Sequence, residues 1–109
     1  MSAGVENQNR FKSTVFYALS DPIRLEIIMY LRQEEKCVCE IVPHLHLIQP
    51  LVSRHLRILK ETGIVRCRKD GTKRMYSIVD PRIHTIIDDL TPELVSSLTK
   101  EILEQMTCR

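Results

Sequence analysis

The segment between Pro50 and Gly63 constrains the fold of this 109-residue chain more than any other. Its pattern predicts a helix over residues 50–62, and Gly63 suits the left-handed conformation that often follows a helix end. At a step of about 100° per residue, apolar side chains share one arc of this helix and polar side chains share the opposite arc. The apolar arc holds Leu51, Val52, His55, Leu56, Ile58 and Leu59, and the polar arc holds Gln49, Ser53, Arg54, Arg57, Lys60 and Glu61. One side of the helix is therefore expected to pack, and the other is free to contact a charged partner.

A basic β-hairpin is predicted immediately after this helix. Two β-rich runs, residues 64–69 and 73–79, flank Asp70-Gly71, a dipeptide typical of tight hairpin turns. Residues 49–79 contain eight basic and two acidic side chains, a net charge of +6, whereas the other 78 residues carry −4. Such a local concentration of positive charge is typical of a surface that binds a polyanion.

Helical spacing and capping signals predict five further helices. Asp21 is a suitable N-cap with Pro22 at the first helical position, and Thr91 with Pro92 repeats this arrangement near the C-terminus. A polar break separates the second helix from a short third one. The further helices are expected over residues 9–19, 22–32, 37–45, 81–90 and 92–106.

The order of these elements predicts the fold class. A chain of this length, 43% hydrophobic and only 5% aromatic, is typical of one compact, helix-rich domain. Two helices joined by a tight turn and followed by a basic hairpin match a winged helix-turn-helix. We therefore expect a single, mainly α domain over residues 1–109 with five to six helices and one β-hairpin. The helix-turn-helix would span about 37–62 and the wing about 64–79.

This fold assigns a DNA-binding role to the polar arc and the hairpin. A helix fits the major groove, where polar side chains reach base edges, while surrounding cations neutralise phosphates. The N-terminal half of the helix is expected to contact bases, its C-terminal half to contact phosphates, and the hairpin cations to reach the backbone or minor groove. The expected base-contacting residues are Gln49, Ser53 and Arg54, and the remaining DNA contacts are Arg57, Lys60, Lys69, Lys73 and Arg74. His55, on the apolar arc, is expected to pack or to form a cap-like hydrogen bond.

The cysteines suggest a ligand site. No apolar run reaches the roughly 20 residues of a membrane span, and the first ten residues are polar, so we expect a cytoplasmic chain with reduced thiols. Cys37 and Cys39 form a Cys-X-Cys pair, whose thiolates favour arsenite, Cd(II), Pb(II), Cu(I) or Zn(II). Residues two apart in an ideal helix differ by about 200°, so both sulfurs face one ion only if the helix distorts or its first turn opens. Cys67 shares the alternating face of Val65 and is expected to pack.

Four sequence stretches together resemble the arsenic-repressor (ArsR) family of winged-helix metalloregulators. They are ALSDPIRL at 18–25, CVCEI at 37–41, QPLVSRHL at 49–56 and KETGIV at 60–65, in the order and with the spacing of that family. One departure is Ile48, where the family often carries Ser or Thr. The resemblance implies a homodimer with the terminal helices, about 9–19 and 81–106, at its interface. It also implies an imperfect palindromic operator in double-stranded DNA and repression relieved by a ligand.

The same resemblance assigns the inducer site. In arsenic- and cadmium-sensing members a Cys-Val-Cys followed by an acid binds the inducer, and Cys37, Cys39 and Glu40 match it position by position. The third Cys of some arsenic sensors is replaced by Val42, and the N-terminal arm has no Cys. Cys108 is then the best candidate for a third thiolate, and two-thiol binding is the alternative. No obligatory cofactor is expected, only As(III) or a thiophilic metal such as Cd, Pb or Zn as inducer.

Other sites and functions remain open at this stage. His44 and His46 could complete a mixed zinc site, and His84 with Asp88 stands where zinc-sensing relatives place ligands. The thiols could instead form a redox or persulfide switch on the same repressor. A small thiol oxidoreductase is disfavoured because no βαβ pattern surrounds the cysteines. No enzymatic activity is expected, and a winged-helix module for protein contacts is the last alternative.

Overall fold

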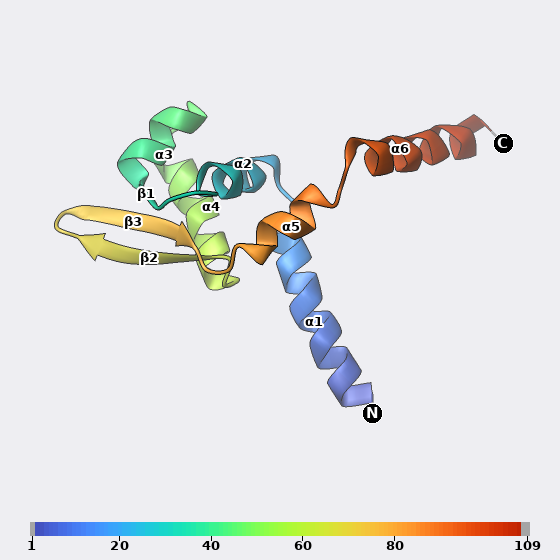
Figure 1. Ribbon diagram of the computed structural model, residues 1–109, viewed down its shortest axis with the longest axis horizontal. Helices are drawn as coiled ribbons and strands as arrows, with labels where there is room; N and C mark the ends of the chain where they lie inside the picture. Colours follow the sequence, from blue (N-terminus) through green and yellow to red (C-terminus); the bar gives the residue numbers. More distant parts are fainter. Residues whose placement is uncertain (1, 108–109) are drawn as a thin grey trace.

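The computed structural model describes residues 2–107, and its fold is the predicted winged helix-turn-helix. Within these residues it contains six helices and three strands (Figure 1). The helices are α1 (Ser2–Ala18), α2 (Pro22–Tyr30), α3 (Val38–Leu45), α4 (Gln49–Glu61), α5 (Arg82–Asp88) and α6 (Pro92–Thr107). The strands are β1 (Lys36–Cys37), β2 (Val65–Asp70) and β3 (Lys73–Ile78).

The core lies where α2, α3 and α4 pack against one another and against the base of the hairpin. These helices bury their apolar faces because apolar side chains at helical spacing gain free energy when they leave water. The largest fully buried side chains in the described chain include Ile27, Ile28, Ile41, Leu56 and Leu59. This core fixes the position of α4, whose polar face remains outside.

The sheet has one strand more than the sequence predicted. Its order is β1-β3-β2, antiparallel throughout, and β1 pairs Cys37 with Met75 of β3. Cys37 was expected inside the third helix, but it has the extended conformation φ −83°, ψ 160° and caps a helix that begins at Val38. A two-residue strand leaves no alternating pattern in the sequence, which explains why the prediction missed it.

The hairpin turn lies one residue later than predicted. Asp70 pairs with Lys73, so the two-residue loop is Gly71-Thr72 rather than Asp70-Gly71. Gly71 has φ 64°, in the left-handed region that glycine adopts without a steric penalty. The shift leaves Lys69 and Arg74 opposite each other, next to the tip of the wing.

Several helix ends differ from the prediction. The side chain of Asp21 accepts hydrogen bonds from the backbone of Ile23 and Arg24, as its predicted capping role requires. Helix α1 begins at Ser2 rather than near residue 9. Its first two turns carry no apolar periodicity, so the sequence did not indicate a helix there. Helix α2 ends at Tyr30, two residues early, and α5 covers only Arg82–Asp88 of the expected 81–90.

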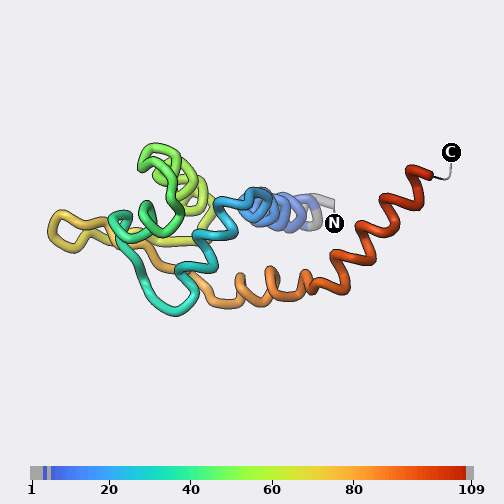
Figure 2. Tube along the Cα trace, turned by 90° about the horizontal axis from the view of Figure 1, so that it is seen from above, coloured from blue at the N-terminus to red at the C-terminus, as the bar shows by residue number. Residues whose placement is uncertain are grey.

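Helices α1 and α6 project from the body of the molecule in both views (Figures 1 and 2). The molecule is elongated, with extents of 59 × 41 × 24 Å. Phe11 of α1 is 74% exposed, and α6 buries none of its described residues. Its exposed apolar side chains are Leu94, Val95, Leu98, Ile102, Leu103 and Met106. In the described part of the chain, no helix combines the length and hydropathy that crossing a membrane requires.

Candidate nucleic-acid interface and thiol site

Helix α4 divides into the two faces that the sequence indicated. Val52, His55, Leu56 and Leu59 are buried. All five candidate contact residues of this helix, Gln49, Ser53, Arg54, Arg57 and Lys60, are exposed. Ile48 precedes the helix without a side-chain capping bond, as its apolar character implies. The polar face is therefore a solvent-facing row with two uncharged hydrogen-bonding groups at its start and cations along its length.

The three candidate contact residues of the wing, Lys69, Lys73 and Arg74, are exposed as well. Arg68, in contrast, forms an ion pair with Glu35 and is compensated within the fold. The ion pairs found among residues 2–107 include none of the eight candidate DNA-contacting side chains. Their charges are thus available to an external anion, which is the requirement for binding phosphate.

A buried arginine connects the recognition helix to α1. Nε and Nη2 of Arg24 donate to the carbonyl oxygens of Ala18 (2.8 Å) and Tyr17 (3.1 Å), which end α1. Its Nη1 lies 3.1 Å from Nδ1 of His55 on α4. Because α1, α2 and α4 all contact this one guanidinium, the orientation of α4 is coupled to that of α1.

The Arg24 contact determines the state of His55, whose side chain is buried. A guanidinium only donates hydrogen bonds, so Nδ1 of His55 must accept, and the ring proton of the neutral tautomer is on Nε2. Burial lowers the pKa of His55, while nearby Asp21 raises it and Arg24 and Arg54 lower it further. The buried role predicted for this histidine is therefore correct, and its hydrogen-bond partner is identified.

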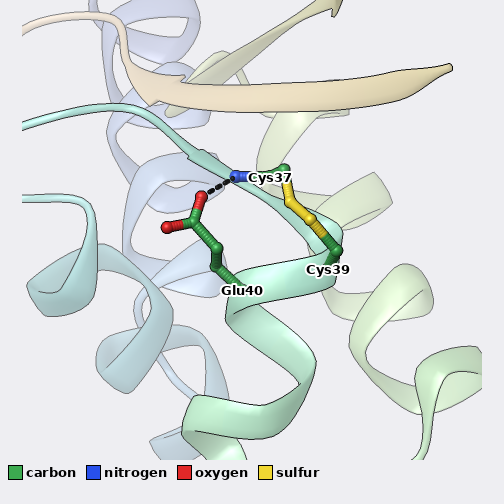
Figure 3. Close-up of a disulfide and its surroundings, with 3 residues drawn as sticks. All are labelled: Cys37, Cys39 and Glu40. Atoms are coloured by element: carbon green, nitrogen blue, oxygen red, sulfur yellow. Dashed lines mark hydrogen bonds between the residues drawn. A yellow bond between two sulfur atoms is a disulfide. The ribbon is translucent and has the colours of Figure 1, made fainter.

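Cys37 and Cys39 lie side by side at the beginning of α3 (Figure 3). Their Cα atoms are 5.1 Å apart and their sulfur atoms are joined as a disulfide, whereas reduced thiols were expected from the sequence. The pair can meet because Cys37 is extended and only Cys39 has entered the helix, so the first turn is open as the spacing argument required. Cys37 is 1% exposed, whereas Cys39 is exposed to solvent.

Glu40 caps α3 rather than joining the sulfurs. Its Oε1 accepts a hydrogen bond of 3.0 Å from the backbone N–H of Cys37. In Figure 3 the carboxylate points to that nitrogen, on the side away from the disulfide. Glu40 therefore stabilises the helix start that holds the two cysteines.

The thiol pair lines a groove that also contains candidate DNA-contacting residues. The groove has a volume of about 680 Å³. Its walls come from the start of α3, the first turns of α4 and the wing strand β3. The lining residues are Cys37, Val38, Cys39, Val42, Pro43, Gln49, Ser53, Thr72, Lys73, Arg74 and Tyr76. Tyr76 is partly buried, and this burial is the main cause that raises its pKa. A side-chain hydrogen bond with Cys67 raises the pKa of Tyr76 further.

The other candidate metal ligands have different partners. Nε2 of His84 lies 3.0 Å from the carbonyl oxygen of Ile28, and Asp88 forms an ion pair with Arg32. His44 stacks on the ring of Tyr30. Cys108 lies outside the described residues. Among residues 2–107, no three His, Cys, Asp or Glu side chains gather closely enough to hold a metal ion.

Two features of this site were missed in the sequence. Arg24 falls at helical spacing with Ile27, Ile28 and Leu31, so the period of α2 already placed it on the buried face. The participation of Thr72 and Tyr76 in the groove had no local signal, because it depends on how β3 pairs with β1.

The geometry defines a winged helix-turn-helix protein in which the polar face of α4 and the wing form an exposed basic surface, with the two cysteines in the adjoining groove. Residues 21–66 match the model of the family described as bacterial regulatory protein, arsR family. An HTH-type transcriptional regulator from Methanocaldococcus jannaschii, described as uncharacterized, is 48% identical over 69 residues, 62% of this chain and 78% of the relative. The chain therefore belongs to the arsR family, whose members are regulatory proteins rather than enzymes.

Further relatives and solved structures agree with this assignment. The arsenical resistance operon repressor of Staphylococcus xylosus is 41% identical over 66 residues, 61% of this chain and 64% of the relative. The homodimeric winged helix-turn-helix DNA-binding domain from Mycobacterium bovis superimposes with a TM-score of 0.70 at 26% identity, over 95% of this chain and 92% of that one. The curated relatives are matched over 47% to 78% of their own lengths, so parts of several lie outside the similarity.

Proposed function

We propose that this chain is a single-domain, homodimeric repressor that leaves its operator when arsenite or another thiophilic metal binds Cys37 and Cys39. The proposal rests on one observation: the two cysteines line a groove whose other walls carry four candidate DNA-contacting residues, Gln49, Ser53, Lys73 and Arg74. It is supported by a relative named as an arsenical resistance operon repressor. The protein would act in the cytoplasm, where operator DNA is accessible.

The proposed DNA-binding surface consists of the polar face of α4 and the tip of the wing. Gln49, Ser53 and Arg54 would contact base edges from the major groove, and Arg57 and Lys60 would contact phosphates. Lys69, Lys73 and Arg74 on the wing would contact the neighbouring backbone or minor groove. Two copies related by twofold symmetry would then read an imperfect palindrome.

The proposed release mechanism follows from the shared groove. Cys37 and Cys39 would hold the ion in the groove that the first turns of α4 and strand β3 also line. Such a ligand shifts the equilibrium away from DNA if its contacts are better in the free conformation than in the DNA-bound one. Trigonal binding would need a third sulfur, for which Cys108 is the candidate, and a site of two thiolates is the alternative.

Operator binding tests the proposal directly. Fluorescence anisotropy of reduced protein on the DNA upstream of its own gene is expected to rise on binding and to fall at stoichiometric arsenite, Cd(II), Pb(II) or Zn(II). The order of these four ligands identifies the inducer. Tight binding that none of them disturbs would remove metal sensing from the proposal, and absence of binding would remove the repressor.

Arg57→Ala is expected to weaken binding to all DNA sequences alike. Arg57 is exposed in the middle of α4, so its loss should remove about one phosphate contact and lower the slope of log Kd against log salt by about 1. Anisotropy titrations over a series of salt concentrations measure both quantities. Arg32→Ala, an exposed arginine paired with Asp88 away from this face, is the matched control. An unchanged slope in the Arg57 variant would exclude this part of α4 from the interface.

The proposed dimer uses the exposed faces of α1 and α6. Leu98 and Ile102 stand one turn apart on α6 and are exposed in the single chain. Their simultaneous replacement by Glu would bury two unpaired carboxylates in an interface, so the variant is expected to sediment as a monomer at micromolar concentration. Lys100→Glu, which changes the net charge of the same helix by the same −2 at an already charged position, is the control. A double variant that remains dimeric would place the interface elsewhere.

A thiol redox switch on the same repressor is the second candidate function. It is favoured by the disulfide that joins Cys37 and Cys39. Such a switch would release DNA on oxidation with no metal present. Diamide treatment of metal-free protein in the anisotropy assay therefore separates it from the metal-responsive repressor.

A further inference from the structure

The groove is much larger than a metal ion needs. Its volume of about 680 Å³ is in the range of pockets that hold small organic molecules, about 300–1,000 Å³. Val42, Pro43 and Tyr76 supply apolar surface, and Gln49, Ser53 and Thr72 supply neutral hydrogen-bonding groups. The volume and the mixed lining of the groove therefore suit an organic ligand with a sulfur-reactive centre better than a bare ion.

The charge of the lining selects among such ligands. Lys73 and Arg74 are the charged residues of the lining, and the eleven lining residues include no carboxylate. Neither cation forms an ion pair with another of the described residues. Glu40, the acidic neighbour of Cys39 in sequence, is outside the lining and accepts the backbone N–H of Cys37. The groove is therefore an electropositive environment that favours anionic ligands over cationic ones.

The two sulfurs differ in accessibility. Cys37 is 1% exposed and Cys39 is exposed, so a molecule in the groove reaches Cys39 first. Cys37 is shielded from external molecules but lies next to the sulfur of Cys39. This is the arrangement that a two-step thiol–disulfide exchange requires, in which one thiol attacks and its neighbour resolves.

We propose that the groove binds small anionic disulfides, with Cys39 as the attacking thiol and Cys37 as the resolving thiol. The thiolate of Cys39 attacks one sulfur of the external disulfide, forms a mixed disulfide and releases one anionic thiolate. The thiolate of Cys37 then attacks Sγ of Cys39, forms the Cys37–Cys39 bond and releases the second thiolate. The protein loses two electrons and the external disulfide is reduced to two thiols. This proposal rests on the second candidate function, the thiol redox switch, and specifies the chemical class of its oxidant.

The selectivity is measured on free, reduced, full-length protein without DNA or metal. The probes are oxidised glutathione, which is anionic, and cystamine, which is cationic, with the reaction followed by acid quenching and intact mass. The Lys73→Ala/Arg74→Ala variant is expected to react about tenfold more slowly with oxidised glutathione and faster with cystamine. Arg10→Ala/Lys12→Ala removes the same charge from α1, outside the lining, and is expected to change either rate less than about twofold. High salt should reduce the difference between the probes.

The roles of the two thiols have separate readouts. Cys37→Ser is expected to accumulate the mixed disulfide at Cys39, whereas the wild-type protein proceeds to a species two hydrogens lighter. Cys39→Ser should lose the fast reaction, and peptide mapping separates the site from Cys67 and Cys108. Equal effects of the two charge-removing variants, or fast modification of Cys37 in Cys39→Ser, would overturn the proposal. Anisotropy on operator DNA is independent of these rates, so failure of the repressor and failure of this selectivity are distinguishable.

Discussion

Reduced protein carrying Cys39→Ser is expected to bind its operator normally and to remain bound when arsenite is added. Cys39 is exposed at the start of α3, and its bond to Cys37 is absent from the reduced protein, so operator affinity should change by less than about twofold. Loss of one of two adjacent thiolates converts a two-point attachment into a single one. The arsenite concentration for half-maximal release should therefore rise by about 10²- to 10⁴-fold, as measured by anisotropy.

Cys67→Ser is the matched control for this experiment. Cys67 is a partly buried thiol of strand β2, opposite Tyr76, and lies outside the groove lining. Its replacement should leave the arsenite response unchanged. If Cys39→Ser responds to arsenite like the wild-type protein, the inducer binds elsewhere in the chain. If Cys39→Ser fails to bind operator at all, the start of α3 contributes to DNA binding, and Cys37→Ser then decides whether the thiols sense the ligand.

Those parts of the fold that carry a repeating pattern could be predicted from the sequence. Helix α4 was predicted almost to the residue because its apolar and polar side chains separate cleanly at helical spacing, which makes its faces computable. The wing was predicted because β-rich runs flank a turn-forming dipeptide, although pairing moved the loop to Gly71-Thr72. These two elements contain all eight candidate DNA-contacting residues.

The parts that depend on distant contacts were not predictable. Strand β1 exists only because Lys36 and Cys37 pair with β3, some forty residues further along the chain. That pairing holds Cys37 extended and brings the two thiols together, so the most consequential detail of the site has no local signature. The exposed apolar faces of α1 and α6 are a related case, because their periodicity predicted burial that a single chain does not supply.

The Arg24 contact shows how local and distant information combine in this fold. Asp21 caps α2 and so fixes where the helix begins, which directs Arg24 inward. There Arg24 donates to the carbonyl oxygen of Ala18 at the end of α1 and lies within hydrogen-bond distance of His55 on α4. A side chain with these three partners couples a helix of the proposed dimer interface to the recognition helix. The loss of unfolding free energy on removing the Arg24 side chain therefore measures how strongly α1 and α4 are coupled.

Arg24→Ala is expected to lower the free energy of unfolding by about 3–5 kcal/mol. The substitution leaves the buried carbonyl oxygen of Ala18 and Nδ1 of His55 without their guanidinium donor. It also removes one donor from the carbonyl oxygen of Tyr17, which still accepts from Ser20. Urea denaturation at a fixed protein concentration measures the change, because the stability of a dimer depends on concentration. Arg24→Lys keeps the charge but lacks the planar fork, so it should restore only a minor part of the loss.

Two further variants make this prediction specific. Arg32→Ala removes an exposed arginine that pairs with Asp88 and should cost about 0–1 kcal/mol. In a double-mutant cycle of Arg24→Ala with His55→Ala, the coupling should reach about 1 kcal/mol or more, because the two side chains share one buried hydrogen bond. A loss at Arg24 no larger than that at Arg32 would contradict its connecting role. Additive effects of Arg24 and His55 would place the connection between α1 and α4 in the apolar core instead.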